Sequence, residues 1–162
     1  MKKCKEQDSG ATALYLASKL GHEDVVQVLL AKENLDINHV EKKYGETALY
    51  IGSEHGHSQV VQLLLQHVDI DVNHVAQDGW TALMIAAQNG HKEIVSLLCW
   101  REDLDTKIVD TDGYSALDIA ERASKRNKKI ADMIRNYSAT STKKSISKAA
   151  NKVFRRCNST RF

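Results

Sequence analysis

Gly45-Glu46-Thr47-Ala48-Leu49 is one of four copies of a short motif that decides how this chain folds. The other copies begin at Gly10, Gly79 and Gly113, and the last has serine in place of threonine. Successive copies therefore start 35, 34 and 34 residues apart. A period this regular predicts a stacked array of similar units, and not one core built from distant segments.

Further motifs recur at fixed places in each copy. A Gly-His pair follows about ten residues after the first glycine, at 21–22, 56–57 and 90–91. Each pair precedes a run whose apolar residues recur four positions apart, as Val25 and Leu29 do, which places them on one helical face. Asp36-Ile37-Asn38 and Asp71-Val72-Asn73 end the first two copies, and a degraded version ends the third.

Together these motifs resemble the ankyrin repeat family, whose repeat of roughly 33 residues is a β-turn followed by two helices. The resemblance covers about residues 8–137. It implies an all-α solenoid of four helix-turn-helix repeats with β-turn fingers, at about 8–42, 43–76, 77–110 and 111–137. Residues 138–162 would follow as a linker and a basic amphipathic helical tail.

The motif residues have a local physical role in this arrangement. The hydroxyls of Thr12, Thr47, Thr81 and Ser115 are placed to cap the first helix of each repeat. Glycines 21, 56 and 90 end that helix, where a positive φ is needed. The histidines that follow them lie a whole repeat apart with no ligand at metal spacing, so we interpret them as structural hydrogen-bonding residues.

The chain departs from the family in the four-residue motif that starts the first helix of each repeat. The family commonly has Thr-Pro-Leu-His where this chain has Thr12-Ala13-Leu14-Tyr15, and the chain contains no proline. Losing that histidine removes a group with which the family ties neighbouring repeats together. We therefore expect ordinary stability, below that of consensus-like arrays.

Composition limits the classes of function. No apolar run approaches the roughly 18 residues of a membrane span, and the N-terminus has no apolar stretch of a secretory signal. Cys4, Cys99 and Cys157 lack pair or metal spacing, which suggests free thiols in a reducing compartment. We expect a cytoplasmic protein, with the nucleus as an alternative location.

Motifs of catalysis are missing from the sequence. There is no nucleophile elbow, phosphate-binding glycine loop, His-Glu-x-x-His or paired-cysteine metal site. We therefore expect no enzyme activity, no cofactor and no metal.

Charge is divided unevenly along the chain. Residues 1–120 hold 10 Lys and Arg against 19 Asp and Glu, a net −9, whereas residues 121–162 hold 13 against 2, a net +11. Within the basic end, Lys125, Arg126, Lys128 and Lys129 have the spacing of a nuclear-import or polyanion-binding patch. The competing interpretation, which we favour, is the solvated face of a capping repeat.

The last segment predicts a short amphipathic helix. Ile146, Ala149, Ala150, Val153 and Phe154 form one apolar stripe flanked by basic residues. Three interpretations are open: it packs on the last repeat, it binds an anionic membrane or a partner's groove, or it is disordered.

The family resemblance places a protein partner on the concave surface made by the β-turn tips and the first helices. Matching this chain to that pattern gives the partner-binding residues Lys43, Tyr44, Glu46, Glu54, His55, Val75, Gln77, Asp78, Trp80, Gln88, Asn89, Val109, Thr111, Asp112 and Tyr114. The predicted function is therefore a protein–protein interaction module, a scaffold or adaptor, whose partner the sequence does not identify.

Two aromatic residues in this set take equivalent places in adjacent repeats. Trp80 and Tyr114 are either exposed interface anchors or rings that pack on the neighbouring turn. The first interpretation predicts that Trp80→Ala weakens partner binding by roughly 2 kcal/mol while stability stays nearly unchanged. The second predicts a matching loss of stability.

The sequence also bears on modification, partners and assembly. Asn38 and Asn73 follow the context in which the family's asparagines are β-hydroxylated, so the resemblance makes them candidate acceptors. The basic C-terminal region would suit nucleic acid or an anionic membrane, would dock on the acidic repeats, or would serve as the export signal of a secreted effector. We expect a monomer, although pairing through the first repeat is also possible because Leu16 and Leu20 are poorly capped there.

Overall fold

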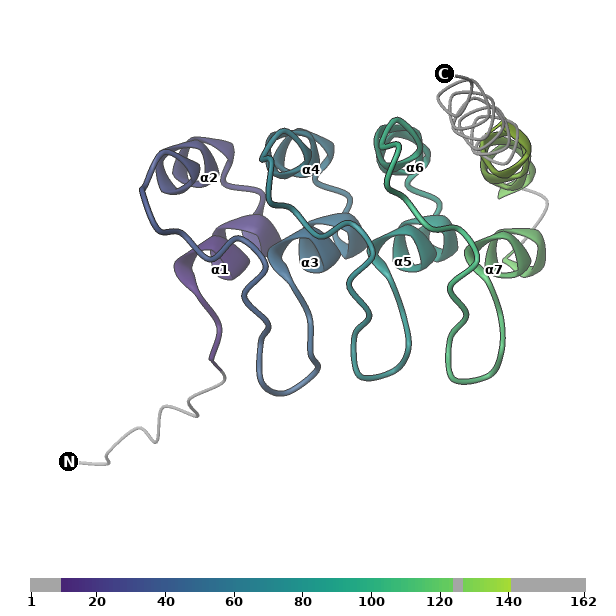
Figure 1. Ribbon diagram of the computed structural model, residues 1–162, viewed down its shortest axis with the longest axis horizontal. Coiled ribbons are helices and arrows are strands. Elements are labelled where there is room, and N and C mark those ends of the chain that lie inside the picture. Colours follow the sequence, from purple (N-terminus) through teal and green to yellow (C-terminus); the bar gives the residue numbers. More distant parts are fainter. Residues whose placement is uncertain (1–9, 124–126, 141–162) are drawn as a thin grey trace, which may run out of the picture.

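Two parallel layers of short helices make up the molecule, as the computed structural model shows (Figure 1). It describes residues 10–123 and 127–140, so the predicted tail helix, Lys125 and Arg126 lie outside the described residues. The first layer holds α1 (Ala13–Leu20), α3 (Ala48–Glu54), α5 (Ala82–Asn89) and α7 (Ala116–Arg122). The second holds α2 (Glu23–Leu30), α4 (Ser58–Leu65), α6 (Lys92–Cys99) and a helical segment at 128–140.

Each first helix begins at the predicted hydroxyl residue. The side chains of Thr12, Thr47 and Thr81 accept a hydrogen bond from the backbone N–H three residues later. Ser115 does the same, and Asp118 completes a capping box by accepting from the Ser115 backbone. These caps satisfy N–H groups that an α-helix leaves free at its start.

The turn between the two helices of a repeat is also the contact with the next repeat. Gly21, Gly56 and Gly90 have φ of 72°, 78° and 78°, as predicted. A Cβ on Gly21 would come within 2.6 Å of the His57 ring, and a Cβ on Gly56 within 2.6 Å of the His91 ring. Glycine is therefore needed here both for its backbone conformation and because the next repeat's histidine lies against it.

Two of the recurrent histidines bond to the preceding repeat, which confirms the structural interpretation for these two. His57 Nε2 donates to the Lys19 carbonyl at 3.1 Å, and His91 Nε2 donates to the Glu54 carbonyl at 3.0 Å. In the last repeat the side chain of Asn127, which is buried, donates to the Ala87 carbonyl at 2.8 Å. Asn127 lies 36 residues after His91, so two extra residues in this repeat preserve the contact.

Asparagines join the loops that follow the second helices. Asn38 Nδ2 donates to the Asp69 carbonyl at 2.7 Å, and Asn38 Oδ1 accepts from the Asp71 N–H at 2.8 Å. Asn73 repeats both bonds one repeat later, to the Asp103 carbonyl at 2.7 Å and from the Asp105 N–H at 2.8 Å. Each amide thus uses its donor and its acceptor on the neighbouring repeat.

One hydrophobic cluster runs through all four helical pairs. Its largest fully buried side chains are Leu14, Leu49, Leu64, Leu83, Met84, Ile94, Leu98, Ile134, Val26, Val60, Val61 and Val72. Cys99 packs against this cluster, and burial raises the pKa of its thiol to about 11. Cys99 ends α6 at the place where Leu30 ends α2 and Leu65 ends α4, so it fills a leucine position of the core.

The two ends of the array differ in how they are covered. Leu16 and Leu20 are 49% and 62% exposed, as expected, whereas Ile51, the counterpart of Leu16 one repeat later, is buried. At the other end the helix continues through residue 140, which differs from the predicted linker start at 138. The hydroxyls of Ser138 and Thr140 bond to carbonyls one turn back, so these polar groups find partners within the helix.

Hairpin-like fingers precede α3, α5 and α7. They project from the first layer on the side opposite to the second layer (Figure 1). Each closes with a backbone bond, for example from the Ala76 N–H to the Trp80 carbonyl at 2.9 Å. The Gly79 N–H donates to the Ala76 carbonyl at 3.0 Å, and the Gly113 N–H repeats this bond to Asp110 at 3.0 Å. The fingers are therefore stiff turns and not loose loops.

Gly79→Ala should destabilise the array more than Gly113→Ala. The two glycines have φ of +84° and +83°, so alanine meets the same backbone cost, about 1–2 kcal/mol, at both. A Cβ on Gly79 would also come within 2.7 Å of the Thr111 backbone nitrogen, whereas nothing lies within 4 Å of a Cβ on Gly113. Urea unfolding of both variants measures the difference, and equal losses would show that close finger packing contributes nothing.

Candidate partner-binding face

The predicted partner-binding residues share one side of the array. They come from the three fingers before α3, α5 and α7 and from the ends of α3 and α5, and we name this surface the finger face. Twelve of them are exposed: Lys43, Tyr44, His55, Val75, Gln77, Asp78, Gln88, Asn89, Val109, Thr111, Asp112 and Tyr114. Glu46, Glu54 and Trp80 are half-buried.

Carboxylates that the sequence analysis did not single out hold the fingers in shape. Glu41, which is buried, accepts from the N–H groups of Lys43 and Tyr44 at 2.8 Å each. Asp110, also buried, accepts from Asp112 and Tyr114 at 3.0 and 2.8 Å. An acidic residue at the start of the first and third turns, where the second has Ala76, was the available signal, since Asp and Glu side chains readily bond backbone N–H groups nearby.

Neighbouring fingers are joined to each other. The Gln77 N–H donates to the Tyr44 carbonyl at 3.0 Å, and the Thr111 hydroxyl donates to the Asp78 carbonyl at 3.3 Å. The exposed side chains at the tips therefore stand on a continuous, hydrogen-bonded base. Such a base keeps their spacing fixed, which reduces the entropy lost when a partner binds.

A hollow of about 270 Å³ opens on the finger face between α5 and α7. It is lined by Trp80, Gln88, Asp110, Asp112, Tyr114, Ile119, Arg122 and Ala123. The Arg122 guanidinium lies 4.0 Å from the centre of the Tyr114 ring. Arg122 and Ile119 were missed by the sequence analysis because nothing in the local motif marks them as neighbours of a finger.

Trp80 packs inside the face instead of projecting from it. Its ring contacts the main core and a second small cluster of Tyr50, Ala76 and Ile85. This position favours the packing interpretation, which predicts that Trp80→Ala lowers stability. Tyr114, in the equivalent place one repeat later, is 37% exposed because no further finger covers it in the described residues.

An acidic group lies at the centre of the finger face. The Tyr15 hydroxyl donates to Glu46 Oε2 at 2.6 Å, so tyrosine at the position of the family's histidine still ties two repeats together. Burial raises the pKa of Glu46, and the nearby carboxylates of Glu54, Glu41 and Asp78 raise it further, although the bond from Tyr15 lowers it. The face thus concentrates negative charge where it is half-buried.

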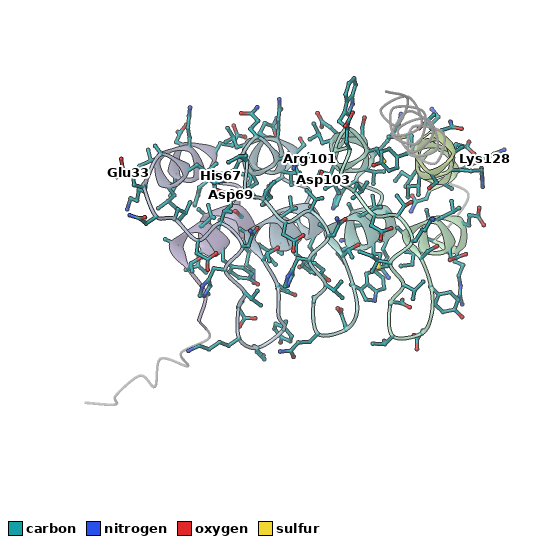
Figure 2. All side chains as sticks on the ribbon, viewed as in Figure 1. Glu33, His67, Asp69, Arg101, Asp103 and Lys128 are labelled. Carbon is teal, nitrogen blue, oxygen red and sulfur yellow. The ribbon has the colours of Figure 1, made fainter. Side chains whose placement is uncertain are left out.

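The other candidate residues, Asn38, Asn73, Lys128 and Lys129, lie away from the fingers. Loops after the second helices carry Glu33, His67, Asp69, Arg101 and Asp103, and Asp69 and Asp103 supply the carbonyls to which the two asparagines bond (Figure 2). Both amides of Asn38 and Asn73 are engaged there, and their hydroxylation stays a prediction. Lys128 and Lys129 are exposed on the segment at 128–140, in the second layer.

Comparison with known protein families agrees with this architecture. A family model described as ankyrin repeats, in three copies, matches residues 1–76 and again residues 68–145. The chain belongs to the ankyrin repeat family. No curated protein matches the chain closely enough to add a more specific relationship.

Family membership fixes the general kind of protein. Ankyrin repeats are protein–protein interaction modules, and ankyrin repeat proteins are typically non-enzymatic. Among residues 10–123 and 127–140, no helix is both long and apolar enough to cross a membrane. Over the same residues, no three His, Cys, Asp or Glu side chains are grouped so as to hold a metal ion.

Trp80→Ala and Tyr114→Ala should separate packing from exposure. Removing the half-buried Trp80 ring leaves space beside Tyr50 and Ile85 and should lower the free energy of unfolding by about 2 kcal/mol. Tyr114→Ala should cost less than about 1 kcal/mol, since it removes an exposed ring and one contact with a guanidinium. Chemical unfolding of both variants gives the comparison, and a Trp80 loss no larger than that of Tyr114 would contradict the packing.

Glu46→Gln should flatten the dependence of stability on pH. Folded Glu46 has a raised pKa, so it holds its proton more tightly than in the unfolded chain. Its contribution to stability is therefore present at low pH and is lost as the pH rises from about 4 toward 7. Glutamine still accepts from Tyr15 without the charge, so wild type should lose more stability than Glu46→Gln over this range. Glu93→Gln on α6 is the exposed control, and parallel curves for Glu46→Gln and wild type would contradict the assignment.

Proposed function

We propose that this ankyrin repeat chain holds a protein partner on its finger face. The observation that carries the proposal is the division of labour between the two sides of the array. Stacking buries the apolar sides of both layers. The fingers present nine exposed predicted residues on a hydrogen-bonded base, and the ends of α3 and α5 add three more. A rigid surface of varied side chains next to a hollow suits recognition of a protein segment.

Features within the face give the partner two kinds of contact. The hollow beside Tyr114 and Arg122 has the size to admit one side chain of a partner. Tyrosine and arginine are also the residue types, with tryptophan, that most often dominate binding energy at interfaces. Trp80 contributes mainly as the wall of that hollow, since its ring is packed on Tyr50 and Ile85.

Selection of binders tests the proposal without a known partner. Short random peptides displayed on phage would be selected on the full chain and then retested on two double variants. Tyr44→Ala/Tyr114→Ala changes exposed rings on the finger face, and Val68→Ala/Trp100→Ala changes still more exposed apolar residues after the second helices. Circular dichroism melts would confirm that both variants fold.

The two variants should separate the finger face from the rest of the surface. We expect selected peptides to lose at least about tenfold in affinity for Tyr44→Ala/Tyr114→Ala and little for Val68→Ala/Trp100→Ala. Peptides that depend on Val68 and Trp100 but not on Tyr44 and Tyr114 would place the binding surface on the second layer and contradict the proposal.

A further inference from the structure

Tyr50 has a polar group that the fold itself does not use. Its side chain lies on α3, is only 4% exposed, and packs with Ala76, Ile85 and Trp80. No described residue forms a hydrogen bond with its hydroxyl, unlike the Tyr15 hydroxyl one repeat earlier, which bonds Glu46. The fully buried side-chain oxygens without a partner in the described residues are those of Ser18 and Ser53, so the Tyr50 hydroxyl oxygen is not completely sealed from solvent.

Three carboxylates of the finger face lie near Tyr50. Burial raises the pKa of Tyr50, and the charges of Asp78, Glu46 and Glu54 raise it further. Glu54 lies one turn after Tyr50 on the same helix, and Asp78 comes from the finger before α5. Among the described residues, one of these three carboxylates lies within ion-pair distance of a basic side chain. Glu54 is 3.7 Å from the His55 ring, which is long for such a contact.

The chemistry of this place favours a particular kind of group. The side chains packed with Tyr50, those of Ala76, Ile85 and the half-buried Trp80, are apolar or aromatic, and the nearby side chains of Asp78, Glu46 and Glu54 are acidic. The described carboxylates are not grouped as metal ligands. An arginine side chain fits both parts, because its stem and planar guanidinium pack on aromatic rings while five N–H groups donate to oxygen acceptors.

We propose that the finger face over α3 and α5 takes an arginine-bearing basic segment of a partner protein. The guanidinium lies between the Tyr50 hydroxyl, which accepts a hydrogen bond, and the carboxylates of Glu46, Glu54 and Asp78. This inference rests on the proposed function, since it names the chemistry of the partner that the same face holds.

The chain's own basic end is a less suitable source of that segment. Residues 141–162 contain seven Lys and Arg and no Asp or Glu. They follow the helical segment at 128–140, which lies in the second layer, on the side of the first helices opposite to the fingers (Figure 1). A partner's segment approaches the fingers directly from solvent, so we assign the site to a partner.

Binding of a defined probe to the full chain tests the assignment. The probe is a fluorescent peptide of alternating alanine and arginine, and its control replaces each arginine by citrulline, which keeps the shape but lacks the charge. We expect fluorescence anisotropy to show binding of the arginine peptide and at least about tenfold weaker binding of the citrulline peptide.

Variants then locate the peptide on the array. Tyr50→Phe keeps the packed ring and removes only the hydroxyl, and Glu54→Gln removes one charge; each should weaken the arginine peptide roughly tenfold. Glu23→Gln/Asp24→Asn removes two exposed charges from the first turn of α2 and should leave the affinity unchanged. Melting curves identify any variant that fails to fold. Either Tyr50→Phe or Glu54→Gln tests the assignment alone if the other variant does not fold.

Several results would overturn the inference. Equal losses in Glu54→Gln and Glu23→Gln/Asp24→Asn would mean that the peptide senses net charge only. Equal binding of the citrulline peptide would mean that the guanidinium charge contributes nothing to binding. Tighter peptide binding by the full chain carrying Lys148→Gln/Lys152→Gln would mean that its own basic end occupies the site.

The proposed function can survive when this inference fails. Phage-selected peptides without arginine or lysine, which bind Tyr50→Phe as well as wild type but lose affinity for Tyr44→Ala/Tyr114→Ala, would leave the finger face as the binding surface and remove its basic partner. If the selected peptides lose affinity for neither variant, both the proposed function and this inference are contradicted.

Discussion

No helix labelled in this chain is long enough to be stable alone, so every repeat depends on its neighbour. The helices α1 to α7 have seven or eight residues, below the roughly 12–15 at which isolated helices become even marginal in water. Stacking buries their apolar sides in one continuous cluster. Polar side chains then set the register, since His57, His91 and Asn127 each reach a carbonyl of the preceding repeat.

This dependence explains where function can reside. The sides of each helical pair are consumed by stacking, and the loops after the second helices are joined by Asn38 and Asn73. The fingers are the remaining projecting elements, and they are stiffened by their own turns. Change at their tips leaves the stack intact, which is why an array of this kind can present new side chains to a partner without refolding.

Much of the fold could be predicted because the motif residues act locally. A threonine that caps its own helix and a glycine with a positive φ leave the same trace in every repeat. The details between repeats were harder, because they depend on which side chains meet in space. Asn127 replaces a histidine after two extra residues, and its motif offered no trace of that role.

The candidate site shows the same limit. The sequence analysis placed Trp80 and Tyr114 as equivalents, but the next finger covers only the region beside Trp80, so one ring is packed and the other exposed. Tyr50 was not selected at all, since its buried ring and unbonded hydroxyl become notable only beside the carboxylates of other segments. Position in a repeat predicts the backbone well and the surroundings of a side chain poorly.

Asn73→Ala is the most direct measurement of the central claim, that bonds between repeats hold this array together. The substitution leaves the core untouched and removes the bonds to the Asp103 carbonyl and from the Asp105 N–H. The account predicts that the free energy of unfolding in urea falls by about 1–3 kcal/mol, with Asn136→Ala on an exposed helical position as the unchanged control. A loss no larger than that of Asn136→Ala would show that the repeats stack through apolar burial alone.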